Sequence, residues 1–389
     1  MGAMTSQQRR VDGIDCLRAL AIVYVLMNHI GLRLLFAHVP FLRSMPQWLG
    51  TALIWQGQAG VQIFFAVSGY LITSTSIRRW GPPPPLSNLN VSEFYKLRAA
   101  RIAPLLLTLL AVLSVLHFLG YRDYHVSDKV GGLPAALLAA LTLRVGWFEA
   151  TRGYFPANWD ILWSLSVEEL FYLAFPLLVR ILRRNLLLIA LLIFIVLGPF
   201  ARTVFAGANE TWQEYTYLGG MDAIAMGCLT AMLTARHHFS RTTLRAMACA
   251  GIAVMVFCLG FSKVAAQLGL NRSGLSFTLL GVAACLVIVA SVQSGWRAPR
   301  WMHGPLALGR RSYEIYLTHM FVVFGCFHAF VALGKPMRLV PVLFLLTILL
   351  ALALGEIVGR CFSEPANHWL RRQLGVASKD AAGIGGAEA

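Results

Sequence analysis

The apolar residues of this chain gather into blocks of about 20, the length that an α-helix needs to cross a hydrocarbon core of roughly 30 Å. Short polar segments separate the blocks, and several of them contain clusters of arginine. Eleven blocks run approximately over residues 16–36, 58–76, 102–119, 132–148, 159–182, 186–205, 215–234, 245–261, 274–294, 306–331 and 338–362. The pattern predicts an all-α, polytopic transmembrane helix bundle.

The block at residues 132–148 is distinguished by Gly131, Gly132 and Pro134 at its start and by Arg144 within it. If this block crossed, Arg180, Arg183 and Arg184 would lie outside, against the rule that Lys and Arg collect on the cytoplasmic side. We therefore expect about ten spans, a re-entrant or interfacial segment at 132–148, and both termini in the cytoplasm. The inner loops then carry about twice as many basic residues as the outer loops.

Composition agrees with a membrane protein. Of the 389 residues, 58% are hydrophobic and 13% are charged, whereas soluble domains contain about 25% charged residues. Because no long polar block divides the chain, we expect one integral membrane domain over residues 1–372 and a disordered tail over 373–389. The net charge of +16 is explained by basic cytoplasmic loops, so we expect no nucleic-acid partner.

Two basic side chains, Arg18 and His29, stand inside the first apolar block. They are eleven residues apart, so at about 100° per residue both point from nearly the same face of a helix. Each has a structural explanation, since a neighbouring helix can hydrogen-bond the histidine and the arginine can extend to the membrane boundary. Their alignment favours a functional site in which a neutral imidazole acts as base or nucleophile.

A polar stripe follows one face of the fifth span candidate. Asp160, Ser164, Glu168 and Tyr172 recur every four residues, which places them on one side of a helix. Glu168 and Glu169 are adjacent acids in an apolar run, and such groups are costly inside a membrane. Either acid can be a structural partner of an arginine, but the depth of Glu168 matches that of the histidine in the first block, which favours a shared site.

The block at 306–331 carries a second histidine. Ser312, Tyr316 and His319 share one helix face, at positions i, i+4 and i+7. A histidine that is hydrogen-bonded within the core is the structural alternative for His319. Its depth near the middle of the membrane makes a functional role the competing interpretation.

Near the predicted inner surface, Arg98 and Arg101 lie about one helical turn apart. The cytoplasmic preference of arginine and contacts with lipid headgroups explain them, while a clamp for the phosphates of a cytosolic nucleotide ligand is the alternative. Asp222 is another buried acid, for which we expect a structural arginine partner. We expect no metal site, because no His and Cys residues stand at metal-ligand spacing.

Together these segments resemble the acyltransferase 3 family of integral membrane acyltransferases, over about residues 11–365. The matching positions are Arg18 with His29; residues 60–71; Arg98 with Arg101; Trp163, Ser164, Leu165, Ser166 and Glu168; Ser312, Tyr313, Tyr316, Leu317 and His319; and Glu364 with Pro365. Gln62 departs from the family pattern, in which an acid is common. Met320 and Phe321 follow His319 in the block at 306–331, where a proline is common in the family.

The resemblance implies transfer of an acyl group, most commonly acetyl, from cytosolic acyl-CoA to a hydroxyl of a carbohydrate-type acceptor. A surface polysaccharide or a glycolipid is the expected acceptor, and acyl-CoA is the expected co-substrate. The expected location is the inner (plasma) membrane of a bacterial cell, as a multi-pass protein surrounded by lipid.

We hypothesise that His29 acts as the base, that Glu168 with Glu169 controls its proton, and that Arg18 orients the donor. The predicted donor-binding residues are Arg98, Arg101, Ser312, Tyr313, Tyr316 and His319. A proton-coupled transporter is the alternative, because buried His, Glu and Arg residues also form proton relays. The enzyme binds acyl-CoA and releases CoA thiol, whereas a transporter moves a solute and needs no thioester.

Overall fold

The computed structural model describes residues 11–81, 89–204, 209–215 and 217–376, and all regular structure in these ranges is helical. Within them, ten helical segments are long and apolar enough to cross a membrane. The predicted all-α bundle of about ten spans is thus confirmed. Arg9, Arg10, the proline run at 82–85 and most of the predicted tail at 373–389 lie outside the described residues.

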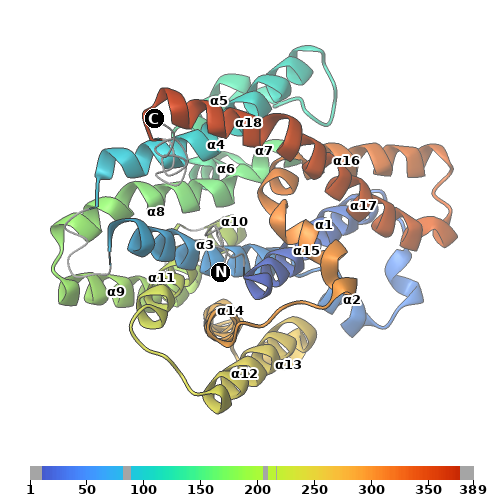
Figure 1. The fold of residues 1–389 in the computed structure, drawn as a ribbon. Helices are drawn as coiled ribbons and strands as arrows, with labels where there is room; N and C mark the ends of the chain where they lie inside the picture. The colour runs from blue at the N-terminus through green and yellow to red at the C-terminus, as the bar shows by residue number, and fades with distance from the viewer. Residues whose placement is uncertain (1–10, 82–88, 205–208, 216, 377–389) are drawn as a thin grey trace.

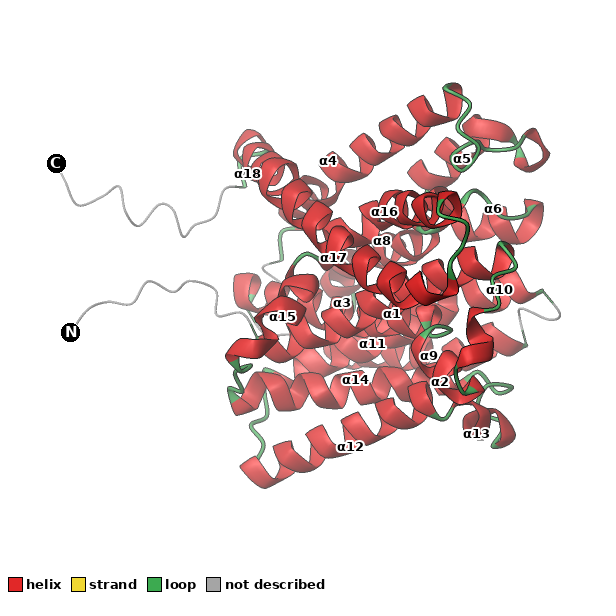
Figure 2. Ribbon diagram, turned by 90° about the vertical axis from the view of Figure 1, so that its right-hand side faces the viewer, coloured by secondary structure: helices red, strands yellow, loops and turns green. Residues whose placement is uncertain are grey.

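The spans form a bundle whose short connecting helices lie at its two faces (Figures 1 and 2). The long helices are α1 (Asp12–Phe36), α3 (Gly57–Trp80), α4 (Val91–Phe118), α8 (Leu162–Ile181), α9 (Arg184–Thr203), α11 (Tyr217–Thr234), α12 (Arg241–Gly260), α14 (Leu275–Ser294), α16 (Ser312–Ala332) and α17 (Val340–Val358). The shorter helices are α2 (Gln47–Leu53), α5 (Gly132–Leu141), α6 (Val145–Arg152), α7 (Ala157–Asp160), α10 (Glu210–Tyr215), α13 (Ser262–Gln267), α15 (His303–Arg310) and α18 (Glu364–Gln373). Single 3₁₀ turns lie at Phe41–Ser44, Asp128–Val130, Arg300–Met302 and Met337–Leu339, and a π-helical turn lies at Gly359–Ser363.

The beginning of α1 and the end of α18 lie at the same face of the bundle (Figure 2). We call this the inner face, because the arginine-rich ends of the spans gather there and the positive-inside rule predicts that it is cytoplasmic. Helices α2, α5, α6, α10 and α13 lie at the opposite face, which we call the outer face. An even number of crossings returns the chain to the face from which it started.

The segment predicted at 132–148 does not cross. It forms α5, which is 10 residues long, and the start of α6, which is 8 residues long; a crossing needs about 20. Leu143, between them, has φ 58°, a left-handed conformation that interrupts a helix. Both helices lie at the outer face (Figure 2).

Two predicted blocks differ from the observed helices at their inner ends. The block at 306–331 is interrupted at Arg311, which leaves the α-helical conformation and separates α15 from α16. The Arg311 guanidinium donates to Glu356 and to Glu364, each at 2.6 Å, and these hydrogen bonds raise the pKa of Arg311. The block at 338–362 is too short, because α17 continues through the π-helical turn into α18.

Helices α3 and α11 pack so closely that their backbones touch. A Cβ atom at Gly69 would lie 1.9 Å from the carbonyl oxygen of Ile224, and one at Gly227 would lie 2.1 Å from that of Ala66. Membrane helices associate through such small residues because lipid offers no hydrophobic drive between apolar surfaces. This contact fixes α3, which carries one wall of the site described below.

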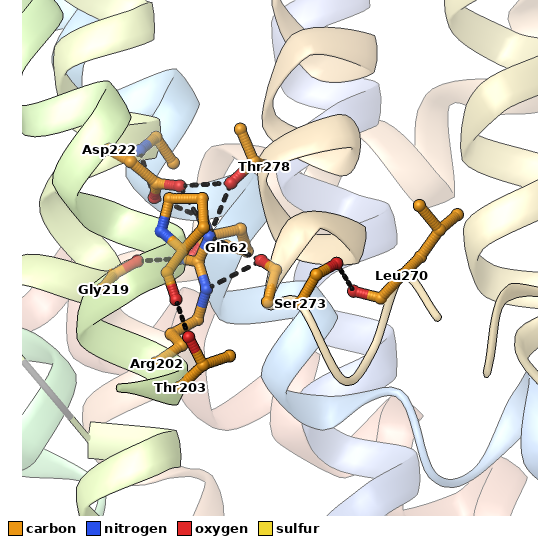
Figure 3. Close-up of polar contacts among 11 residues, drawn as sticks. Gln62, Arg202, Thr203, Gly219, Asp222, Leu270, Ser273 and Thr278 are labelled. Carbon is orange, nitrogen blue, oxygen red and sulfur yellow. Dashed lines mark hydrogen bonds and ion pairs between the residues drawn. The ribbon is translucent and has the colours of Figure 1, made fainter. Parts of the chain in front are cut away.

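A buried polar network joins α3, α9, α11 and α14 (Figure 3). The side chain of Asp222 is fully buried and accepts hydrogen bonds from Arg202, Gln62 and Thr278, each at 2.8 Å. The structural arginine partner predicted for Asp222 is therefore present, and it is Arg202. Gln62, the departure from the family pattern, belongs to the same network.

Candidate functional site

A cavity of about 1460 Å³ enters the bundle from the inner face and is walled by α1, α3, α4, α8, α16 and α18. Eight of the ten predicted site residues line it, namely Arg18, Arg98, Arg101, Glu168, Glu169, Ser312, Tyr313 and Tyr316. Arginines outnumber acids in the lining, with Arg18, Arg78, Arg79, Arg98, Arg101 and Arg371 against Glu93, Glu168 and Glu169. The cavity is thus positively charged and suits an anionic ligand.

One wall of the cavity is a network of polar side chains on α3, α4 and α8. Ser68 donates to Glu168, and the Tyr172 hydroxyl donates to the same carboxylate oxygen at 2.5 Å. The Arg98 guanidinium stacks over the Tyr172 ring at 3.8 Å and pairs with Glu169 at 3.1 Å. Ser164, Glu168 and Tyr172 of the predicted polar stripe thus line the cavity, whereas Asp160 lies at the end of α7 and does not. Both adjacent acids have specific partners.

A second set of contacts joins α4 to α16, where Arg101 pairs with Glu314 at 3.3 Å and lies 4.9 Å from the centre of the Tyr313 ring. Glu314 also accepts from the Ser363 hydroxyl at 2.9 Å, and its side chain is buried. The sequence analysis assigned no role to Glu314. The sequence did contain a signal for it: Glu314 is an acidic residue in the first turn of an apolar span, and such a group needs a cationic partner.

Arg18 connects α1 to α16 in the wall of the cavity. Its Nε donates to Ser312 Oγ at 3.0 Å, and Asp15 on the same helix lies 3.9 Å away. The side chain is 21% exposed and lines the cavity. This position suits a group that orients an anionic ligand.

His29 and His319 do not line the cavity. They lie further towards the outer face, with ring centroids 5.1 Å apart. Within the described part of the chain, Glu168 makes no hydrogen bond to His29: it lines the cavity, and its Oε1 atom accepts from the hydroxyls of Ser68 and Tyr172. Among the described residues, the imidazole that faces His29 belongs to His319.

The donor-binding residues predicted from sequence are therefore divided by the structure. Arg98, Arg101, Ser312, Tyr313 and Tyr316 surround one cavity, whereas His319 packs against the proposed base. The lining also includes Arg371 on α18, whose Nε is buried with no partner. The sequence analysis assigned no site role to Arg371, because its approach to α3 and α4 depends on how the last helix folds back.

Comparison with known proteins gives one family match and several relatives. A family model described as an acyltransferase domain (Acyl_transf_3) matches residues 11–356. The putative peptidoglycan O-acetyltransferase YrhL of Bacillus subtilis is 26% identical over 349 residues, which cover 82% of this chain and 49% of that protein. O-acetyltransferase OatA of Staphylococcus aureus is 23% identical over 377 residues, which cover 92% of this chain and 57% of that protein.

A third relative, peptidoglycan O-acetyltransferase OatA of Listeria monocytogenes, is 26% identical over 340 residues, covering 80% of this chain and 49% of that protein. The chain thus spans about half the length of the curated relatives it matches. No solved structure matches the chain.

Proposed function

The chain belongs to the acyltransferase 3 family, and from this we propose that it is a membrane O-acetyltransferase. The donor is cytosolic acetyl-CoA, and the acceptor is a hydroxyl of a carbohydrate such as a cell-wall or surface glycan. The names of the relatives, which are O-acetyltransferases and in two cases peptidoglycan O-acetyltransferases, support this reaction. The observation that carries the proposal is the arginine-rich cavity that leads from the inner face towards a pair of histidines.

The cavity suits the phosphate-bearing end of CoA. Arg98 uses one guanidinium nitrogen for Glu169, while its Nε is buried and has no partner. Arg371 has a buried, unpartnered Nε as well. Guanidinium groups bind phosphate oxygens through paired N–H donors, so the CoA phosphates would supply the acceptors that these two arginines lack.

The flexible arm of CoA would carry the thioester from the arginines towards Arg18 and the histidines. The rise along α1 from Arg18 to His29 is roughly 16 Å. The neutral imidazole of His29 takes the proton of the acceptor hydroxyl, and Arg18 holds the donor in place. A base of this kind contributes about 10²–10⁴-fold to the rate.

The test is acetyl-CoA-dependent thermal stabilisation of the purified protein, followed by release of CoA thiol in the presence of acceptor. Ligand at about 100 times its dissociation constant stabilises by roughly 2.7 kcal/mol. The double variant Arg98→Gln/Glu169→Gln removes a charged pair together, so no buried charge loses its partner, and it should lose the stabilisation. Arg183→Gln, an exposed inner-face arginine outside the cavity lining, is the matched control.

Loss of the shift in the double variant, with a normal shift in the control, supports a donor site in the cavity. Absence of any shift with the wild-type protein at millimolar acetyl-CoA contradicts the proposal. The transport alternative predicts solute movement without thiol release, and the family match and the relatives' names favour the enzyme over it.

A further inference from the structure

Tyr316, Ser164 and Phe64 form one set of contacts in the part of the inner cavity's lining that lies towards the outer face, and we call this set the partition. The Tyr316 hydroxyl lies 2.6 Å from Ser164 Oγ, and its ring meets the Phe64 ring edge-on at 6.1 Å. All three residues line the cavity, whereas His29 and His319 do not. Since both histidines come later on helices that run from the inner to the outer face, they lie on the outer side of this partition.

Each histidine has a buried ring nitrogen without a partner. His319 Nδ1 lies 2.7 Å from the carbonyl oxygen of Tyr316, and because a carbonyl only accepts, Nδ1 carries the proton. Its Nε2 is then a bare acceptor, and this atom is buried with no partner, as is His29 Nδ1. Buried polar atoms are normally hydrogen-bonded. His319 Nε2 and His29 Nδ1 are therefore two places where a bound ligand could supply the missing hydrogen-bond partner.

Polar groups continue from His29 towards the outer face. Arg33 lies one helical turn further along α1, within electrostatic range of His29, Asp123 and Asp160. The Nε atom of Arg33 and the Oδ1 atom of Asp160 are buried and have no partner within the chain. Arg33, Asp160 and His29 are nevertheless each partly exposed as whole residues.

Glu149 on α6 lies next to Asp160. Its carboxyl lies within hydrogen-bonding reach of Asp160, and two carboxylates can share a hydrogen bond only if one of them holds a proton. Burial, with the nearby charge of Asp160, raises the pKa of Glu149 well above its ordinary value. Glu149 therefore keeps its proton and is a positioning residue for Asp160.

We propose that His29, Arg33 and Asp160 form the acceptor site, which opens towards the outer face and binds a neutral, polyhydroxylated sugar. This inference rests on the proposed function and adds where the acceptor binds and what kind of molecule it is. Guanidinium donors beside a carboxylate acceptor match sugar hydroxyls, which both donate and accept.

The charges of the two regions support different ligands. The inner cavity holds six arginines against three acids and suits the anionic donor. In the outer group, Arg33 faces the carboxylates of both Asp123 and Asp160, and Asp123 also contacts His328 at 2.6 Å. The two acids thus balance the nearby basic groups, so this region holds no excess positive charge that would favour an anionic acceptor. A neutral sugar hydrogen-bonds with both signs of charge and needs no counter-ion.

The transfer step conserves atoms and electrons. The sugar oxygen attacks the thioester carbonyl carbon, a new C–O bond forms, and the hydroxyl proton moves to His29 Nδ1. The C–S bond breaks with its electron pair on sulfur, and the proton passes from His29 to the sulfur to give CoA thiol. The imidazole ends neutral, and His319 Nε2 lies beside it as a second acceptor for the proton in transit.

The test measures acetyl transfer in lipid nanodiscs, with acetyl-CoA as donor and the neutral pentamer of N-acetylglucosamine as acceptor probe. Asp160→Asn and Arg33→Gln should each raise the KM for the pentamer at least tenfold and leave acetyl-CoA-dependent thermal stabilisation unchanged. Arg43→Gln, an exposed outer-face arginine, is the matched control and should keep the wild-type KM.

A wild-type pentamer KM in both variants overturns the acceptor site, and so does an equal loss of donor stabilisation. Wild-type protein that is stabilised by acetyl-CoA but transfers nothing to the pentamer overturns the neutral-sugar assignment. Wild-type protein without stabilisation by acetyl-CoA contradicts the proposed function instead, so the two failures are distinguishable. Two variants on different helices guard against misfolding of either one.

Discussion

The buried pair of Arg202 and Asp222 allows a stability prediction whose size follows from the structure. Arg202 is 7% exposed and Asp222 is 0% exposed, and the two side chains lie 2.8 Å apart. Arg202→Met leaves the carboxylate of Asp222 with only neutral donors, from Gln62, Thr278 and a backbone N–H. Removal of one partner of such a pair costs about 3–5 kcal/mol.

The double variant Arg202→Met/Asp222→Asn should be more stable than the sum of the single losses predicts, because it also removes the unpaired charge. Some loss remains, since Arg202 also donates to the carbonyl oxygens of Gly219 and Gly274 (Figure 3). We expect a coupling energy of about 1–3 kcal/mol in the cycle.

The assay is equilibrium unfolding in mixed detergent micelles, monitored by tryptophan fluorescence, for the wild type, both single variants and the double variant. Arg184→Met changes an exposed arginine at the start of the same helix and should shift the free energy of unfolding by less than about 0.5 kcal/mol. Strictly additive losses would refute the reasoning, because they would mean that the two charges do not stabilise each other.

Three further outcomes follow from single contacts. Glu149 is protonated when folded, so its contribution to stability is present below its unfolded pKa and is lost as pH rises through its raised folded pKa. Thermal melts of Glu149→Gln from pH 5 to 9 should therefore show a flatter decline than the wild type, by at most about 1.4 kcal/mol per pH unit, and parallel curves would contradict this. Gly69→Ala should destabilise by more than about 1 kcal/mol in the same unfolding assay, because its Cβ would meet the Ile224 carbonyl oxygen, whereas Gly325→Ala, with nothing within 4 Å, should not. His29→Ala should lower acetyl transfer at least about 100-fold while the protein stays folded and binds acetyl-CoA, and near-normal turnover would exclude His29 as the base.

Much of the fold could be read from the chain because the constraint is local. A bilayer imposes about 20 apolar residues on each crossing, so the length of the blocks identified the candidate spans. The distribution of arginines between the two sides then rejected 132–148. The ends of helices were less predictable. Arg311 interrupts a helical run to reach Glu356 on α17 and Glu364 on α18, and these partners are supplied only by the packing of the last two helices.

The candidate site likewise combines features that the sequence predicted with contacts that only the structure shows. Periodicity placed Glu168 on a polar face and Arg18 on the face of His29, and the structure has Glu168 and Arg18 in the wall of one cavity. Periodicity could not show that the hydroxyls of Ser68 and Tyr172 occupy Glu168. The contact of His29 with His319 was equally out of reach, since the two residues come from the first and ninth of the long helices.

The sequence by itself determined which segments are helices, how many cross, and which of them carry ionisable groups at mid-membrane depth. These properties depend on hydrophobic length and on the 3.6-residue period, and both are written into neighbouring residues. Only the tertiary structure decided the partners: which acid each arginine meets, where the inner cavity ends, and which groups continue towards the outer face. Helices in lipid choose their neighbours through close packing of small residues and through polar contacts between distant segments, and that information is not local to any one helix.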